Sequence, residues 1–145
     1  DGLPDLHAPD AGFHYAALGD VGDGPVPQVV WVRAGGSDAG DGATPATAFG
    51  TLARALAAVS GDALVIVGPG RHAAPSESLG MAAGRIAIVG DPGGVYTGDA
   101  AGLVLIDGAS GGLRISGSVL LRGLVLGGAV GVGLRVDRGA GEVTV

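Results

Sequence analysis

The stretch from Val29 to Gly70 most constrains the fold, because signals for a strand, a loop, a helix and a second strand follow one another in it. Val29 to Val32 is a short β-branched run, too short for a helix, and Trp31 is its natural packing anchor. Ala63 to Val67 has the composition of a buried strand and ends at Gly68-Pro69-Gly70. We therefore predict two buried strands joined by a loop and a helix.

The predicted helix covers about residues 49–60 and makes about three turns. Its apolar residues recur at steps of three and four, which places them in one stripe: Phe49, Leu52, Leu56 and Val59. Thr47 or Thr51 offers an N-cap, and Gly61 stands where a C′ glycine belongs.

The rest of the chain is rich in short apolar runs separated by glycine. Glycine contributes 31 residues and proline 8, but the runs between them are typical of strands with tight turns rather than of a linker. Only 76–83 offers a further turn or so of helix. The predicted strands are Arg85 to Val89, Leu103 to Ile106, Leu113 to Ile115, Val119 to Leu126, Gly133 to Val136 and Val143 to Val145. The predicted fold is mainly β.

An internal period is visible in the last third of the chain. The residues 112–115 match 133–136 at a shift of 21, and 119–121 match 143–145 at a shift of 24. A repeat of this size, carrying two or three short strands, is the size of one turn of a solenoid. A leucine-rich repeat is the alternative, but its frame needs asparagine, which this chain lacks.

Charge and composition exclude several classes of function. The net charge is −6 and the sequence pI is about 4.7, so a phosphate backbone would be repelled and nucleic acid is not an expected partner. All basic residues are arginine, which removes mechanisms that need a lysine base. There is no cysteine for a disulfide or a thiolate, and no apolar run approaches the ~20 residues needed for membrane insertion.

The opening stretch resembles the N-terminal capping helix and first coil of bacterial right-handed parallel β-helix proteins of the pectate-lyase-like superfamily. The resemblance extends over residues 29–145. The matching residues are Trp31, Val32, Gly36-Ser37-Asp38, Phe49, Thr51-Leu52, Ala55-Leu56, Gly61-Asp62 and Gly68-Pro69-Gly70. The chain departs from the family at Arg71-His72, where members usually continue with Thr-Tyr. The resemblance implies a mainly β fold, a right-handed parallel β-helix (solenoid) with one N-terminal capping α-helix at about 49–60.

Residues 1–28 form a separate segment with five aspartates and no helical or strand period. We expect an extended tail or linker, in which Phe13 and Tyr15 pin the segment to a neighbouring surface. Part of it, Pro9 to Tyr15, is similar to the ending found where such β-helix domains close. On that resemblance, residues 1–20 would be the tail of a preceding unit, and residues 29–145 would be the first coils of the next.

Few residues are candidates for a site. Asp38 and Asp41 lie among glycines in the loop before the helix, and they are weak calcium candidates; the alternative is a plain Asp turn. Arg114 and Arg135, one repeat apart, are expected to stack as a solvated outer row rather than to act as catalytic bases. Asp107 and Asp137 are expected to cap turns, and His72, a lone histidine, is expected to be either structural or merely exposed.

These features predict no catalytic site and no confident cofactor. The leading hypothesis is an extracellular or cell-surface β-helix module, secreted according to the resemblance, that acts as a structural, adhesive or carbohydrate-contacting scaffold. One alternative is the N-terminal fragment of a polysaccharide lyase or glycoside hydrolase with active coils beyond residue 145. Another is a self-assembling fibre subunit, because Val145 stops inside a predicted strand and leaves an open edge. The expected partners are a polysaccharide or cell-surface glycan, neighbouring β-helix units, or other copies of the chain.

Overall fold

A computed structural model describes residues 28–75, 85–108, 113–115, 117–128, 134–136 and 143–144. Short β-strands dominate it, with one α-helix and one 3₁₀ turn near the start. The elements are β1 (Gln28–Val32), η1 (Pro45–Thr47), α2 (Leu52–Ala58), β2 (Ala63–Val67), β3 (Gly70–Ala73), β4 (Arg85–Gly90), β5 (Val104–Asp107), β6 (Leu113–Ile115), β7 (Ser118–Arg122), β8 (Val125–Gly127), β9 (Leu134–Val136) and β10 (Val143–Thr144).

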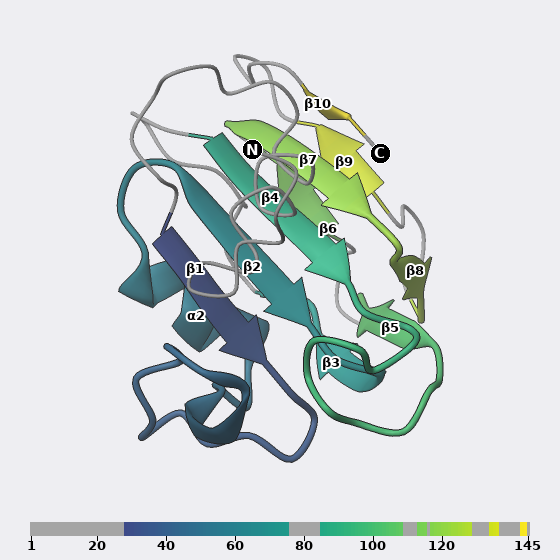
Figure 1. Ribbon diagram of the computed structural model, residues 1–145. Helices are drawn as coiled ribbons and strands as arrows, with labels where there is room; N and C mark the ends of the chain where they lie inside the picture. The colour runs from purple at the N-terminus through teal and green to yellow at the C-terminus, as the bar shows by residue number, and fades with distance from the viewer. Residues whose placement is uncertain are drawn as a thin grey trace, which may run out of the picture.

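The strands form three sheets, and every strand pair in them is parallel. The largest has five strands in the order β1-β2-β4-β7-β10, the second has β3-β5-β8, and the third has β6-β9. From β4 onward, consecutive strands enter the first, second and third sheets in turn, and the cycle then repeats (Figure 1). The prediction of a mainly β fold with one helix is confirmed.

The internal period read from the sequence is confirmed by the strand register. Leu113 pairs with Leu134 at the shift of 21, and Val119 pairs with Val143 at the shift of 24. Residues that match in sequence therefore lie side by side on adjacent strands.

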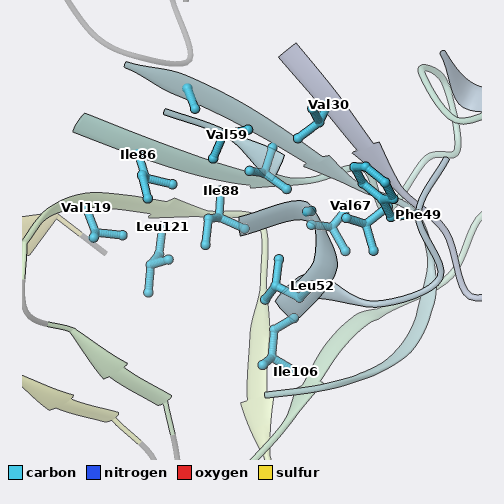
Figure 2. Packing of buried hydrophobic residues seen from close by; sticks show 14 of the residues in the cluster. Val30, Phe49, Leu52, Val59, Val67, Ile86, Ile88, Ile106, Val119 and Leu121 are labelled. Carbon is cyan, nitrogen blue, oxygen red and sulfur yellow. The ribbon is translucent and has the colours of Figure 1, made fainter. Parts of the chain in front are cut away.

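The main core lies on one face of the five-stranded sheet, which we call the inner face. Four residues in register, one from each of β1, β2, β4 and β7, form a row across it: Val30, Val65, Ile88 and Leu121. Leu52 of α2 and Ile106 of β5 are buried in the same cluster (Figure 2). The opposite face, the outer face, carries Leu64, Ile66, Ala87 and Val89, which form a second cluster.

The helix is shorter than predicted. It spans Leu52–Ala58, and Thr51 is its N-cap, with the hydroxyl accepting from the amide of Arg54. The predicted stripe is largely buried, but Phe49 precedes the helix and forms a parallel bridge with Val32 at the free edge of β1. The amide of Trp31 at the same edge donates to the carbonyl of Gly42 at 2.9 Å. Loop residues therefore satisfy the backbone of this edge, while α2 contributes Leu52 to the core.

Two other predictions differ from the structure. The run Val119 to Leu126, predicted as one strand, is two strands, because Gly123 turns the chain with a φ of +67°. Residues 70–73, which follow the predicted end of a strand, form β3. The predictions for residues 1–27, 76–83, Asp137 and Val145 fall outside the described residues.

Candidate functional site

The connection between β4 and β5 is the most distinctive feature of the described surface. It occupies residues 91–103, whereas the equivalent connections between the same two sheets are only residues 68–69 and 123–124. This long connection, which we call the 91–103 loop, extends past the ends of the strands (Figure 1, green). Loops of this length in a compact domain are often functional.

The loop is organised around the buried carboxylate of Asp91. Its Oδ1 accepts from the amide of Val95 at 2.9 Å, and its Oδ2 accepts from the amides of Tyr96 at 2.8 Å and Thr97 at 2.9 Å. The Thr97 hydroxyl, also buried, donates to Oδ2 at 3.1 Å. Hydrogen bonds to a charged acceptor are stronger than neutral ones, so this carboxylate fixes the turn.

A second carboxylate attaches the loop to the rest of the protein. The Arg33 guanidinium, just after β1, forms an ion pair with Asp99 through Nε and Nη2, with Nε 2.9 Å from Oδ2. The Nη1 of Arg33 donates to the carbonyl of Pro45 at 3.1 Å, so one side chain joins three segments. Hydrogen bonding and charge from Arg33 hold the pKa of Asp99 below its usual value, and Asp99 in turn raises the pKa of Arg33.

His72 lies beneath this attachment point. It is buried, and its Nε2 is 2.9 Å from the carbonyl oxygen of Gly68. The Asp99 carboxylate packs against Gly68, where an added Cβ would be 2.7 Å from Oδ2. Of the two roles expected for His72, structural or merely exposed, its burial agrees with the structural one. Its Nδ1 is also buried and has no hydrogen-bond partner among the described residues.

The loop presents apolar side chains to solvent. Val95 is 77% exposed, Leu103 is 71% exposed and Tyr96 is 37% exposed. Among the large apolar residues of the described part of the chain, only Val125 joins them as exposed. Three exposed apolar side chains on one fixed loop suit a contact surface, whereas a hydrophobic side chain exposed on its own needs no explanation.

The calcium candidates lie in a different loop, where their carboxylates bind protein donors. Asp38 Oδ1 accepts from the amides of Gly50 and Thr51, both at 2.9 Å, and its Oδ2 accepts from the Thr51 hydroxyl at 2.8 Å. Asp41 Oδ1 accepts from the Ala43 amide at 3.0 Å and from the Thr47 hydroxyl at 2.5 Å. These hydrogen bonds lower the pKa of both carboxyls.

Such an arrangement is a poor fit to a calcium site. Calcium takes six to eight oxygen ligands, and the described residues contain no group of three or more acidic or histidine side chains that would hold a metal. The geometry gives Asp38 a structural role, because it binds the backbone at the start of α2 and the hydroxyl of the N-cap residue. Calcium at Asp38 and Asp41 stays a prediction.

The other candidates do not converge on one site. Arg114 and Arg135 are register partners in the third sheet, as their spacing of one repeat predicts, and Arg114 is exposed. Their stacking as a solvated outer row stays a prediction. The turn-capping role expected for Asp107 is wrong. It is the last residue of β5, and its Oδ2 binds Arg71 of β3, with Nε at 2.7 Å and Nη2 at 2.5 Å.

Sequence reasoning did not identify the 91–103 loop as a candidate site. No sequence pattern gives a role to Asp91, Asp99 or Arg33. A signal was present: the predicted strands at 85–89 and 119–126 are further apart than one repeat of 21 to 24 residues. The excess length marks an insertion.

Comparison of the chain with protein-family models, curated proteins and solved structures found no match. In the described part of the chain, no helix has the length and apolar character needed to span a membrane.

Proposed function

We propose that the chain is a right-handed parallel β-helix module, related to the pectate-lyase-like superfamily. The cyclic order of strands through three parallel sheets supports this fold, since each sheet gains one strand per repeat. Right-handed crossovers are the rule for parallel strands joined within one sheet, which supports the handedness. The position of α2 beside β1, the first strand of the five-stranded sheet, supports its role as an N-terminal cap.

The module serves as a secreted or cell-surface scaffold that makes adhesive contact with a glycan through the 91–103 loop. The observation that carries this proposal is the combination of internal fixation and outward apolar exposure in that loop. Asp91 and the Arg33–Asp99 pair hold the backbone, so Val95, Tyr96 and Leu103 are presented with little conformational freedom to lose on binding.

A sugar ring matches this chemistry. One face of a pyranose ring carries C–H groups, which pack on apolar side chains, and its rim carries hydroxyls, which need polar partners. Tyr96 has an apolar ring with a polar tip, Val95 precedes it directly in sequence, and Leu103 is a third exposed apolar side chain of the same loop. Arg33 and Asp99, both partly exposed, supply charged groups at the base of the loop.

Binding of the full chain to an array of acidic and neutral polysaccharides tests the proposal. Tyr96→Ala and Val95→Ser should each weaken binding about tenfold, as expected for contacts at the centre of an interface. Val125→Ser is the matched control, because Val125 is 42% exposed but lies on β8. Equal binding by all variants would exclude the loop as the contact surface. Turnover of a polyuronate by the wild type would instead favour the enzymatic alternative.

A further inference from the structure

An exposed arginine lies beside the end of the 91–103 loop. Leu103 is the last residue of that loop, and its carbonyl accepts from the amide of Gly70 at 2.8 Å, so the loop end and β3 lie side by side (Figure 1). Arg71 follows Gly70 and is the register partner of Leu105. With strands about 4.8 Å apart and a rise of about 3.3 Å per residue, the backbones of Arg71 and Leu103 are about 8 Å apart. A sugar ring that covers Leu103 therefore comes within reach of the long Arg71 side chain.

The Arg71 side chain points away from the core, on the same face as the loop end. It is 69% exposed, whereas its neighbour His72 is buried. Successive side chains of a strand point to opposite faces, so Arg71 shares the outward face of the second sheet with its partner Leu105. Leu103, two residues before Leu105, continues that face with 71% exposure. Val125 lies on the far side of β5 from Arg71.

One carboxylate holds the Arg71 guanidinium in place. Its Nε is 2.7 Å and its Nη2 is 2.5 Å from Oδ2 of Asp107 on β5. Neither contact uses Nη1, whose two N–H groups remain for an acceptor outside the protein. Asp107 itself is only 16% exposed, and its Oδ1 packs against Gly128, where an added Cβ would be 2.0 Å away. The carboxylate is therefore fixed by packing, and it fixes Arg71 in turn.

Stability alone does not account for this ion pair. An exposed ion pair contributes little, because water screens the charges and ordering a long side chain costs entropy. The Oδ1 of Asp107 is also buried and has no hydrogen-bond partner among the described residues, which is destabilising for a carboxylate oxygen. A pair that gains little and leaves a buried oxygen unsatisfied is better suited to a binding site than to the framework of the fold.

We propose that the Arg71–Asp107 pair is the polar part of the glycan site and binds the hydroxyls of an uncharged sugar that packs on Leu103. The assignment rests on the proposed function of the 91–103 loop. A sugar hydroxyl offers its oxygen to Nη1 of Arg71, and a hydrogen bond from a charged donor is stronger than a neutral one. Asp107 neutralises the charge of Arg71, and the chain as a whole carries −6, so the site favours a hydroxyl over a carboxylate.

Binding of the full chain to matched neutral and acidic polymers tests the proposal. The probes are the neutral polysaccharides of the array, among them 1,4-linked glucan, mannan and galactan, each beside the same polymer oxidised to the uronate at C6. The wild type should bind a neutral polymer at least about tenfold more tightly than its oxidised form. Arg71→Gln should weaken binding of the neutral polymer about tenfold, because glutamine lacks the planar set of charged donors.

Asp107→Asn gives a readout that a purely structural role would not change. It leaves the charge of Arg71 uncompensated, so the affinity for the oxidised polymer relative to the neutral one should rise about tenfold. Arg85→Gln and Asp62→Asn are the matched controls. These two residues form an exposed ion pair, with Nη2 3.8 Å from Oδ2, at the start of β4 and just before β2, away from the strand ends that carry the loop. Both controls should change each affinity by less than about twofold.

The outcomes separate the role of Arg71 from that of the loop. Wild-type affinity in Arg71→Gln, together with weakened binding in Tyr96→Ala, would overturn the role of Arg71 and leave the loop as the glycan site. An unchanged ratio of affinities in Asp107→Asn would show that the pair does not touch the ligand. Tighter binding of the wild type to an oxidised polymer would overturn the assignment of an uncharged sugar. If no polymer binds, the loop is not a glycan site and Arg71 has no such role.

Discussion

Replacement of Asp91 by alanine should open the 91–103 loop and destabilise the protein. The substitution removes the acceptor for three amides, those of Val95, Tyr96 and Thr97, and for the Thr97 hydroxyl. A hydrogen bond to a charged group contributes about 1.5 to 3 kcal/mol, so four such bonds correspond to roughly 6 to 12 kcal/mol if all donors stayed buried. The loop can open locally and hydrate the freed donors, which reduces the expected loss in unfolding free energy to about 3 to 4 kcal/mol.

Asp91→Asn separates the charge of this side chain from its shape. The amide keeps one accepting oxygen, so if that oxygen takes the place of Oδ2, the Val95 amide faces an NH₂ group instead of an acceptor. We expect a loss of about 1 to 3 kcal/mol for this variant. Asp41→Asn is the control, because the Asp41 carboxylate likewise accepts hydrogen bonds, two in place of the four at Asp91, but is exposed. Its replacement should change the unfolding free energy by about 1 kcal/mol or less.

Urea unfolding followed by Trp31 fluorescence measures the global effect, and amide hydrogen exchange at residues 95–97 measures the local one. Exchange at these three amides should be faster in Asp91→Ala by at least about a hundredfold, since about 2.7 kcal/mol of local protection corresponds to that factor. The reasoning is refuted if Asp91→Ala unfolds within about 0.5 kcal/mol of the wild type and its loop amides remain as protected.

Two further predictions concern the same loop. Asp99→Asn should flatten the loss of stability between about pH 5 and about pH 3: the pKa of Asp99 is lower in the folded state than its unfolded value of about 3.9, so its contribution is complete at neutral pH and disappears as the pH falls through the folded pKa. Urea unfolding across this range measures the change, and an unaltered pH profile would contradict the role of the Arg33–Asp99 pair. Gly94→Ala should destabilise more than Gly98→Ala by over about 1 kcal/mol, because both glycines have positive φ but only at Gly94 would a Cβ meet backbone, at 1.9 Å from the Asp99 carbonyl oxygen. Thermal unfolding of the two variants compares them, and equal losses would mean that the loop does not make this close approach.

The strands and their repeat were readable from the sequence because local composition determines them. Runs such as Ala63–Val67 combine β-branched residues with nearby glycines, and Arg85–Gly90 of the same sheet follows a similar pattern. The shift of 21 between Leu113 and Leu134 appears directly in the strand register, because equivalent positions of successive repeats pair with each other. The presence of a helix was also predictable from the sequence. Its predicted start was about one turn too early, because Phe49 fits the apolar stripe of the helix but forms a bridge with Val32 of β1.

The site was not readable because its contacts join residues that are distant in sequence. Arg33 and Asp99 are 66 positions apart, and nothing near either residue indicates the other. Asp107 shows the same limit: the strand end suggested a turn cap, whereas the side chain binds Arg71 of the neighbouring strand. Composition predicts where an aspartate follows a strand, but its partner depends on which strands the fold brings together.

The spacing of paired residues explains why the loop is the part of this fold most suited to a changeable function. Register partners are 23 residues apart from β2 to β4, 20 from β5 to β8 and 21 from β6 to β9. The separation rises to 33 between Ile86 and Val119 and to 34 between Gly70 and Val104, and both intervals contain residues 91–103. The parallel pairing on either side of the loop continues without interruption, so the added residues lie outside the repeating framework. The entropic cost of closing a loop grows only slowly with its length, so such an insertion changes the surface while destabilising the sheets little. The strand pairing places no constraint on the sequence of the loop, which can therefore vary with the ligand that is bound.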